Sequence, residues 1–324
     1  MISRIIAATS VLAIAAATPT TAQEFPSKTI TLMMPYAAGG PGDTITRIVG
    51  QGLSTVLKQQ TVVENTSGAG GTIGSARVAA AAPDGHTLLV MHIGHATNVA
   101  LYPNLKYDAV KDFEPIGLIG DVPMAIVARK DFPANNFAEL IAYVKANTDK
   151  VNYAHAGIGS ASHLCGLMFF DAIKTEVRSV PYRGTGPAMN DLVGGQVDFM
   201  CDQTVNVIPQ INGGAIKSYA VTTKAKVATL ANLPTADSEG LKDFDLSIWY
   251  AMYAPKGTPK PIMDKLVDGL QKSLADASVK DKLAGLGVDV AAKDRITPDA
   301  LRKHLVSEIA KWAPVIKKSG VTGQ

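Results

Sequence analysis

Glycines and an acidic residue follow a short apolar segment near the start of the chain, in the arrangement of an anion-binding loop. Residues 30–34 are apolar, residues 36–43 are mostly small and end in Asp43, and apolar residues then recur at helical spacing over 45–53. This order predicts a strand, a turn and a helix. A helix that begins behind glycines exposes backbone N–H groups, and these can bind an anion such as a carboxylate. The alternative is a tight turn that only lets the helix pack against the strand.

A second loop of the same kind spans residues 155–163 and follows another apolar segment. It contains Ser160, Ser162 and His163, and we expect a helix after it with one of the serines as its N-cap. A serine beside a histidine also occurs in hydrolases. The Gly-x-Ser-x-Gly motif is absent because Gly159 directly precedes Ser160, and no third member of a triad is evident. We therefore expect no catalytic residue and keep a Ser160-dependent hydrolase as the alternative.

Four histidines, His92, His95, His155 and His163, fall in or beside the predicted loops. Imidazoles are common zinc ligands, but no cysteine or carboxylate completes a closely spaced set, so we expect no metal. An imidazole can donate a hydrogen bond to a carboxylate in its neutral or its charged form. His95 and His163 are therefore predicted to contact a ligand. A hydrolase with a histidine-bound metal stays open as a further alternative.

A third glycine-rich segment, residues 68–74, could suggest a dinucleotide site. Its spacing is Gly-x-Gly-Gly-x-x-Gly, so Ile73 stands where the G-x-G-x-x-G fingerprint requires its last glycine. We therefore expect no nucleotide cofactor, and no cofactor of any other kind.

The first 22 residues have the composition of a secretory signal peptide. Arg4 precedes an apolar segment, residues 5–17, and small residues follow at 20–22. The apolar segment is too short to span a bilayer comfortably. We therefore expect the mature protein to be exported to the periplasm.

The charge of the chain excludes a nucleic-acid footprint. Its 31 Lys and Arg residues against 28 Asp and Glu residues give a net charge of +3, and the basic residues are scattered. A small acidic solute remains compatible with this balance.

Strands and helices alternate along the chain, which predicts an α/β fold with mainly parallel sheets. We expect separate strands at 113–118 and 124–128, a loop at 92–98, and a last helix that Pro314 kinks or ends. The length exceeds what one compact core usually serves, so we expect two domains. Domain one should comprise residues 24–124 and 225–324, and domain two residues 125–224, joined by crossing strands that act as a hinge. In open α/β sheets, ligands bind beyond the carboxyl ends of the strands, where the loops above lie.

The chain has two cysteines, Cys165 and Cys201. An exported protein could pair them in a disulfide. Two buried, unpaired thiols in an apolar core are the alternative, and the sequence does not decide between them.

At its loops the sequence resembles the Bug, or TctC-type, extracytoplasmic solute receptors of tripartite tricarboxylate transporters. The matching segments span nearly the whole mature chain. They are 25–28, 35–43, 64–65 with 68–71, 82–85, 180–188, 191–198 and 249–250 with 254–259.

The resemblance implies a periplasmic binding protein of the type II-like kind, whose two domains close around a carboxylated solute. It implies that backbone amides and ordered water at 36–43 and 157–162 hold the carboxylate, and that Asp202 lies at the cleft. Cys165 departs from the family, in which an alanine is common at this position. The resemblance also implies the membrane subunits of a tripartite tricarboxylate transporter as partners, and we expect a monomer.

We expect a dicarboxylate as the ligand, because Arg183 and the histidines leave donors for a second carboxylate. Aromatic carboxylates and amino acids stay open, and Arg183 could instead be a solvated turn residue. Asp202 would repel an anion unless it accepts a hydrogen bond from an ammonium, a hydroxyl or water. Trp249 and Tyr250 read as sheet core, with one of them lining the cleft. The alternatives are the hydrolases above and a receptor that signals without transport. The predicted ligand-contacting residues are Tyr36, Ala38, Gly39, Gly40, Asp43, His95, Thr97, Gly157, Gly159, Ser160, Ser162, His163, Arg183, Gly184, Asp202 and Trp249.

Overall fold

The computed structural model describes residues 24–323, and the predicted signal peptide, residues 1–22, lies outside them. The helices and strands are β1 (Ile30–Met34), α1 (Pro41–Leu57), β2 (Thr61–Asn65), η1 (Ala69–Gly71), α2 (Thr72–Ala79), β3 (Thr87–His92), α3 (Gly94–Leu101), β4 (Phe113–Arg129), α4 (Phe137–Ala146), β5 (Asn152–His155), α5 (Ala161–Ile173), β6 (Arg178–Pro181), α6 (Thr185–Val193), β7 (Phe199–Gln203), α7 (Thr204–Asn212), β8 (Ile216–Val221), η2 (Ala228–Leu230), β9 (Ser247–Pro255), α8 (Lys260–Ala275), α9 (Ala277–Gly285), β10 (Asp289–Val290), η3 (Lys293–Arg295) and α10 (Pro298–Ser319).

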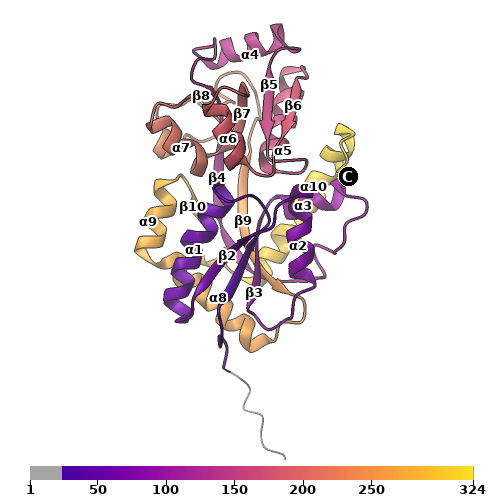
Figure 1. Ribbon diagram of the computed structural model, residues 1–324, viewed down its shortest axis with the longest axis vertical. Helices are drawn as coiled ribbons and strands as arrows, with labels where there is room; N and C mark the ends of the chain where they lie inside the picture. Colours follow the sequence, from indigo (N-terminus) through magenta and orange to yellow (C-terminus); the bar gives the residue numbers. More distant parts are fainter. Residues whose placement is uncertain (1–23, 324) are drawn as a thin grey trace, which may run out of the picture.

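Strand β4 organises the molecule because it takes part in two groups of strands. Its first part pairs with β9 and β10, in the order β2-β1-β3-β9-β4, and its last part pairs with β7 and β8. The second group continues from β7 to β5 and β6. Each group carries its own helices, so the molecule has two lobes with β4 running from one into the other (Figure 1).

We use lobe one for β1 to β3, β9, β10 and their helices, and lobe two for β5 to β8 with α4 to α7. We propose that these lobes are the two domains expected at 24–124 with 225–324 and at 125–224. The chain enters lobe two through β4 and returns to lobe one through β9.

The α/β class is confirmed, and the pairing of the strands is mixed. Strand β1 is parallel to β2 and β3, and β5 is parallel to β6 and β7, as strand-helix alternation predicts. The pairs that involve β4 or β9 are antiparallel. The reason is the crossing itself, because β4 leaves lobe one and β9 comes back beside it in the opposite direction.

Three predictions for individual elements differ from the structure. Residues 113–118 and 124–128 were expected as separate strands and form the single strand β4, whose pairing with β9 contains two register shifts. Residues 92–98 were expected as a loop, but a helix, α3, begins at Gly94. Pro314 was expected to kink or end the last helix, whereas α10 continues to Ser319 and ends at Gly320 in a left-handed conformation.

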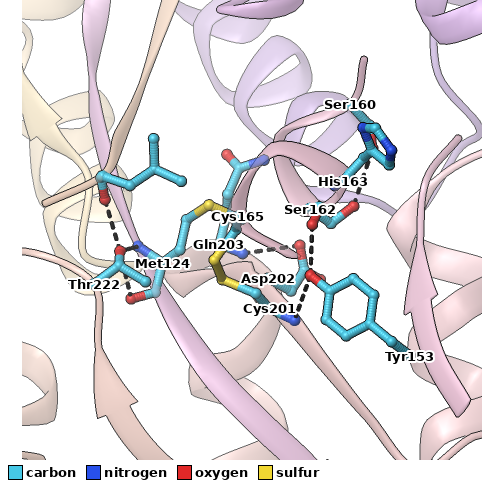
Figure 2. The surroundings of a disulfide bond; sticks show 11 residues. Met124, Tyr153, Ser160, Ser162, His163, Cys165, Cys201, Asp202, Gln203 and Thr222 are labelled. Carbon is cyan, nitrogen blue, oxygen red and sulfur yellow. Dashed lines mark hydrogen bonds between the residues drawn. A yellow bond between two sulfur atoms is a disulfide. The ribbon is translucent and has the colours of Figure 1, made fainter. Parts of the chain in front are cut away.

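Cys165 and Cys201 form a disulfide that joins α5 to β7 inside lobe two, which decides the alternative that the sequence left open. Both residues are buried, and Figure 2 shows the bond between the two elements. None of the helices in residues 24–323 combines the length and the apolar composition that crossing a membrane requires.

Candidate ligand-binding site

A cleft lies where the two lobes meet, and three helices begin at it. Lobe one contributes the start of α1, and lobe two contributes the starts of α5 and α6. The space left between the lobes is about 20 Å³, which holds about one water molecule. The residues that line it are Met34, Tyr36, Ala37, Gly40, Pro41, Gly42, Asp43, His92, Ala156, Ser160, Ala161, Ser162, Thr185, Gln203 and Tyr250.

The helix starts leave backbone donors available at the cleft. The N–H groups of Gly42 and Asp43 in α1, and those of Ala161 and Ser162 in α5, donate to no atom among residues 24–323. The N–H group of Thr185 in α6 likewise donates to no atom among these residues. Unpaired N–H groups and the positive end of the helix dipole favour an anion. Three such ends at one small cavity can hold a carboxylate without a cationic side chain.

No Arg or Lys is among the residues that line the cleft. Asp43 lines it, but its charge is paired with Arg47, whose Nη2 lies 2.9 Å from Oδ1. The other oxygen accepts hydrogen bonds from Arg47 Nε at 2.9 Å and from the Gly39 N–H at 3.1 Å. Asp43 therefore holds the glycine turn in place, and Arg47 offsets the repulsion that this carboxylate would exert on an anion.

Asp202 lies next to the lining residue Gln203 and is fully buried. Burial raises the pKa of its carboxyl group to about 7, against hydrogen bonds from Asn206, the Gln203 N–H and Thr185 that favour the charged form. Below neutral pH the group is mostly protonated. It then adds little negative charge to the cleft.

The histidines near the cleft are neutral at physiological pH. Burial lowers the pKa of His92 to about 3 and the pKa values of His155 and His163 to about 4. His92 Nδ1 accepts a hydrogen bond from the Gly94 N–H at 2.9 Å, and His155 Nδ1 accepts one from the Gly157 N–H at 3.1 Å. Each lobe therefore carries a histidine that closes a turn at the end of a strand.

The loop before α5 is held by its own serines. Ser160 Oγ caps the helix by accepting a hydrogen bond from the His163 N–H at 3.2 Å, as predicted. Ser162 Oγ accepts one from the Ala156 N–H at 2.9 Å, and the two hydroxyl oxygens lie 3.1 Å apart. Among residues 24–323, no hydrogen bond joins Ser160 Oγ to an imidazole nitrogen, and no group of three His, Cys, Asp or Glu side chains could hold a metal ion.

The disulfide lies directly behind this loop. Cys165 is one turn after Ser162 on α5, and Cys201 comes just before Asp202 on β7. Tyr153 makes a second link, because its hydroxyl donates to the Ser162 carbonyl at 2.5 Å and accepts from the Cys201 N–H at 3.3 Å (Figure 2). Lobe two thus ties its two cleft-lining elements together.

The lobes touch each other through backbone around the cleft. The Ala37 N–H donates to the Arg183 carbonyl at 3.2 Å, and the Tyr102 hydroxyl donates to the Ile158 carbonyl at 3.0 Å. A Cβ on Gly186 would lie 2.9 Å from the backbone carbon of Gly39. The structure is therefore a closed form, and a solute larger than water requires the lobes to separate before it can enter.

Residues 45–321 match the family model described as the tripartite tricarboxylate transporter family receptor, TctC. The chain belongs to this family. The family assigned from the loops of the sequence is thereby confirmed, and its members are solute-binding receptors.

Solved structures of similar proteins agree with this assignment. The periplasmic binding protein BugD is 49% identical, with a TM-score of 0.90 over 93% of this chain and 100% of that one. MatC from Rhodopseudomonas palustris with bound malate is 41% identical, with a TM-score of 0.87 over 90% and 100%. The R. palustris protein Rpa4515 with adipate is 30% identical, with a TM-score of 0.87 over 92% and 99%. The chain is thus similar to periplasmic binding proteins, two of which hold carboxylates.

The predicted contact residues fall into three groups in this receptor. Five line the cleft, namely Tyr36, Gly40, Asp43, Ser160 and Ser162. Others belong to the same loops or to the junction of the lobes without lining the cavity, namely Ala38, Gly39, Thr97, Gly157, Gly159, His163, Gly184 and Asp202. Three lie away from it, namely His95, Arg183 and Trp249.

The side chains of these three have surroundings other than the cavity. His95 is buried among Tyr107, Phe113 and Tyr253, with its Nε2 3.1 Å from a backbone carbonyl. The Trp249 indole donates to Glu308 on α10 at 3.1 Å. The Arg183 side chain is exposed, and only its carbonyl meets lobe one. None of these three side chains lines the cavity, and their contact with a ligand stays a prediction.

Sequence reasoning did not include His92, Thr185, Gln203 and Tyr250 among the contacts, although all four line the cleft. Tyr250 faces the cleft because neighbours on a strand point to opposite sides, so it and Trp249 cannot share one environment. For the other three residues, their positions at the end of a strand or the start of a helix could have indicated a place at the cleft. His92 and Gln203 end strands and Thr185 begins a helix, as expected of ligand-contacting residues in this fold class.

Proposed function

We propose that this protein is a periplasmic receptor that captures an organic carboxylate, preferably a dicarboxylate, and delivers it to a tripartite tricarboxylate transporter. The observation that carries the proposal is the meeting of three helix N-termini at a cleft that no Arg or Lys lines. Such a site neutralises an anion with backbone dipoles. The malate and adipate in two similar structures support the same class of ligand.

Capture requires the lobes to open and to close again over the solute. Contacts across the junction, such as that between the Ala37 N–H and the Arg183 carbonyl, form only when the lobes are together. A bound carboxylate that touches both lobes adds its interactions to the closed form alone, and so shifts the population toward it. The membrane subunits of the transporter would then bind the closed form.

A thermal-shift screen of the purified mature protein tests the ligand class. It compares C3 to C8 dicarboxylates, tricarboxylates, aromatic acids, acidic amino acids and uncharged sugars, after unfolding and refolding to remove any co-purified solute. A ligand at 100-fold its Kd stabilises by about 2.7 kcal/mol, which shifts Tm by a few degrees. Shifts confined to carboxylates support the proposal, and a screen in which only uncharged solutes shift Tm contradicts it.

Uptake by cells tests the proposed partnership. A strain that lacks this receptor should lose high-affinity uptake of the radiolabelled carboxylate found in the screen, and osmotic shock should release the receptor with the periplasmic fraction. Normal uptake in the deletion strain would contradict a role in transport.

A further inference from the structure

The protonation of His92 is fixed by its surroundings. Its Nδ1 accepts a hydrogen bond from the Gly94 N–H at 2.9 Å, so that nitrogen carries no proton. Burial lowers the pKa of the ring to about 3, so the imidazole is neutral at physiological pH. A neutral imidazole has one proton, and here it must lie on Nε2.

His92 therefore offers one N–H donor from lobe one. The ring lines the cleft and is held between Tyr36 and Tyr250, with ring-centroid distances of 4.7 and 5.6 Å. Nε2 makes no hydrogen bond within residues 24–323. The donor is thus oriented by its packing and is available to a solute.

Gln203 offers the complementary group from lobe two. It is the last residue of β7, lines the same cleft and is 4% exposed. Its Oε1 is buried and accepts no hydrogen bond from any residue between 24 and 323. A buried acceptor without a donor is costly, typically about 1–3 kcal/mol, so the site favours a solute that supplies one.

The two side chains together specify one chemical group. His92 lines the cleft from lobe one and Gln203 lines it from lobe two, so a solute held between the lobes faces both side chains. A carboxylate only accepts hydrogen bonds and an ammonium only donates them, whereas a hydroxyl does both. We infer that the ligand is a hydroxyl-bearing carboxylate, whose hydroxyl accepts from His92 Nε2–H and donates to Gln203 Oε1.

This inference rests on the proposed function and makes it narrower. The helix N-termini bind the carboxylate, while His92 and Gln203 select the hydroxyl. Because both side chains are uncharged at pH 7, the selection is independent of salt. A site that pairs a donor and an acceptor with a hydroxyl rejects an analogue without it, because both groups are then left buried and unpaired.

Matched pairs of acids test the inference by calorimetry. Each pair differs by one hydroxyl and covers one chain length: tartronate and malonate, L-malate and succinate, 2-hydroxyglutarate and glutarate, 2-hydroxyadipate and adipate. L-aspartate replaces the hydroxyl of malate by an ammonium. In the pair that binds most tightly, we expect the hydroxyl member to exceed its partner by at least about tenfold in affinity.

Two variants locate the source of the preference. In His92→Asn the Asn Oδ1 can still accept from the Gly94 N–H, so the turn is kept, while the Nε2–H donor is lost together with the ring between Tyr36 and Tyr250. Gln203→Met keeps the length of the side chain without the acceptor. In each variant the affinity ratio within the pair should fall toward one. The control is His304→Asn on α10, outside the cleft, which should keep the ratio.

The outcomes separate this inference from the proposed function. If both members of the best pair bind wild-type protein equally, or if aspartate binds as well as malate, the hydroxyl selection is wrong while the carboxylate receptor stands. If no acid binds, both fail. Without any ligand, nitrogen-15 NMR should show the His92 proton on Nε2 and no titration of the ring down to pH 5, and a proton on Nδ1 would overturn the assignment.

Discussion

The disulfide between Cys165 and Cys201 should supply much of the stability of lobe two. It closes a loop across a sequence separation of 36 residues. In the chain-entropy treatment, a cross-link of this span removes about 13 cal/mol/K from the unfolded chain, which corresponds to about 4 kcal/mol at 25 °C. Breaking the bond should therefore lower the free energy of unfolding by about 4 kcal/mol, a large share of what a domain of this size has.

The distribution of tryptophans lets the two lobes be followed separately. Both tryptophans of the chain, Trp249 on β9 and Trp312 on α10, lie in lobe one, so their fluorescence reports that lobe alone. Far-UV circular dichroism reports both lobes. In a urea titration with reductant, we expect lobe two to unfold at a lower urea concentration, which shifts part of the dichroism transition. The midpoint of the fluorescence transition, which reports lobe one, should shift less.

The variant Cys165→Ala/Cys201→Ala supplies the control. It should unfold at low urea with or without reductant, and reductant should change only the wild-type curve. A shift of less than about 1 kcal/mol in both comparisons would refute the entropic argument. An equal shift of the fluorescence and dichroism curves would show instead that the lobes unfold as one cooperative unit.

Three further predictions concern the cleft and its titrating groups. Gly186→Ala should keep or raise Tm, because alanine is the better helix former, yet it should weaken carboxylate binding at least about tenfold, since its Cβ would meet the Gly39 backbone at 2.9 Å when the lobes close. The control Gly285→Ala, whose Cβ would meet nothing within 4 Å, should leave the affinity unchanged. Equal affinities of Gly186→Ala and wild type in calorimetry would contradict closure. The pKa of Asp202 is raised in the folded state to about 7, so its ionisation costs stability as pH rises from about 4 through 7. The Tm of Asp202→Asn should therefore rise relative to that of wild type between pH 5 and pH 8. A Tm difference that does not change with pH would contradict the raised pKa. Burial lowers the pKa values of His92, His95, His155 and His163 to about 3 or 4, so below pH 6.5 the unfolded chain binds more protons than the folded one. The free energy of unfolding from urea titration should therefore fall as pH is lowered from 6.5 to 4. A free energy that stays constant over this range would show that these rings are not buried as described.

Local patterns in the sequence predicted most of the elements. The strand 30–34 and the helices after the two glycine loops follow from apolar spacing and capping residues, and the structure has them. The sequence did not reveal that β4 is one strand, because Gly120, Asp121 and Pro123 interrupt its apolar pattern. Pairing with β9 and β10 carries the strand through that interruption, and such pairing is tertiary information.

The sequence predicted the parts of the candidate site that consist of backbone N–H groups, but not the side chains that line it. Loops with glycine and serine before helices mark N–H donors wherever they occur, so the loops 36–43 and 155–163, which lie at the cleft, could be identified from sequence. Side chains are different, because their direction depends on partners far away in the chain. His95 faces an aromatic cluster and His92 faces the cleft although they are three residues apart, and spacing alone could not distinguish them. The disulfide likewise depends on α5 packing against β7.

Part of the junction between the lobes is made of main chain, and this separates two properties of the protein that could otherwise interfere. Gly39, Gly184 and Gly186 bring backbone against backbone there, so this part of the fit between the lobes depends little on side chains. The cleft presents the side chains of His92, Gln203 and Tyr250, which take no part in that backbone contact. Under the proposed function, exchanging these side chains would change the preferred solute while the backbone contact between the lobes stays as it is.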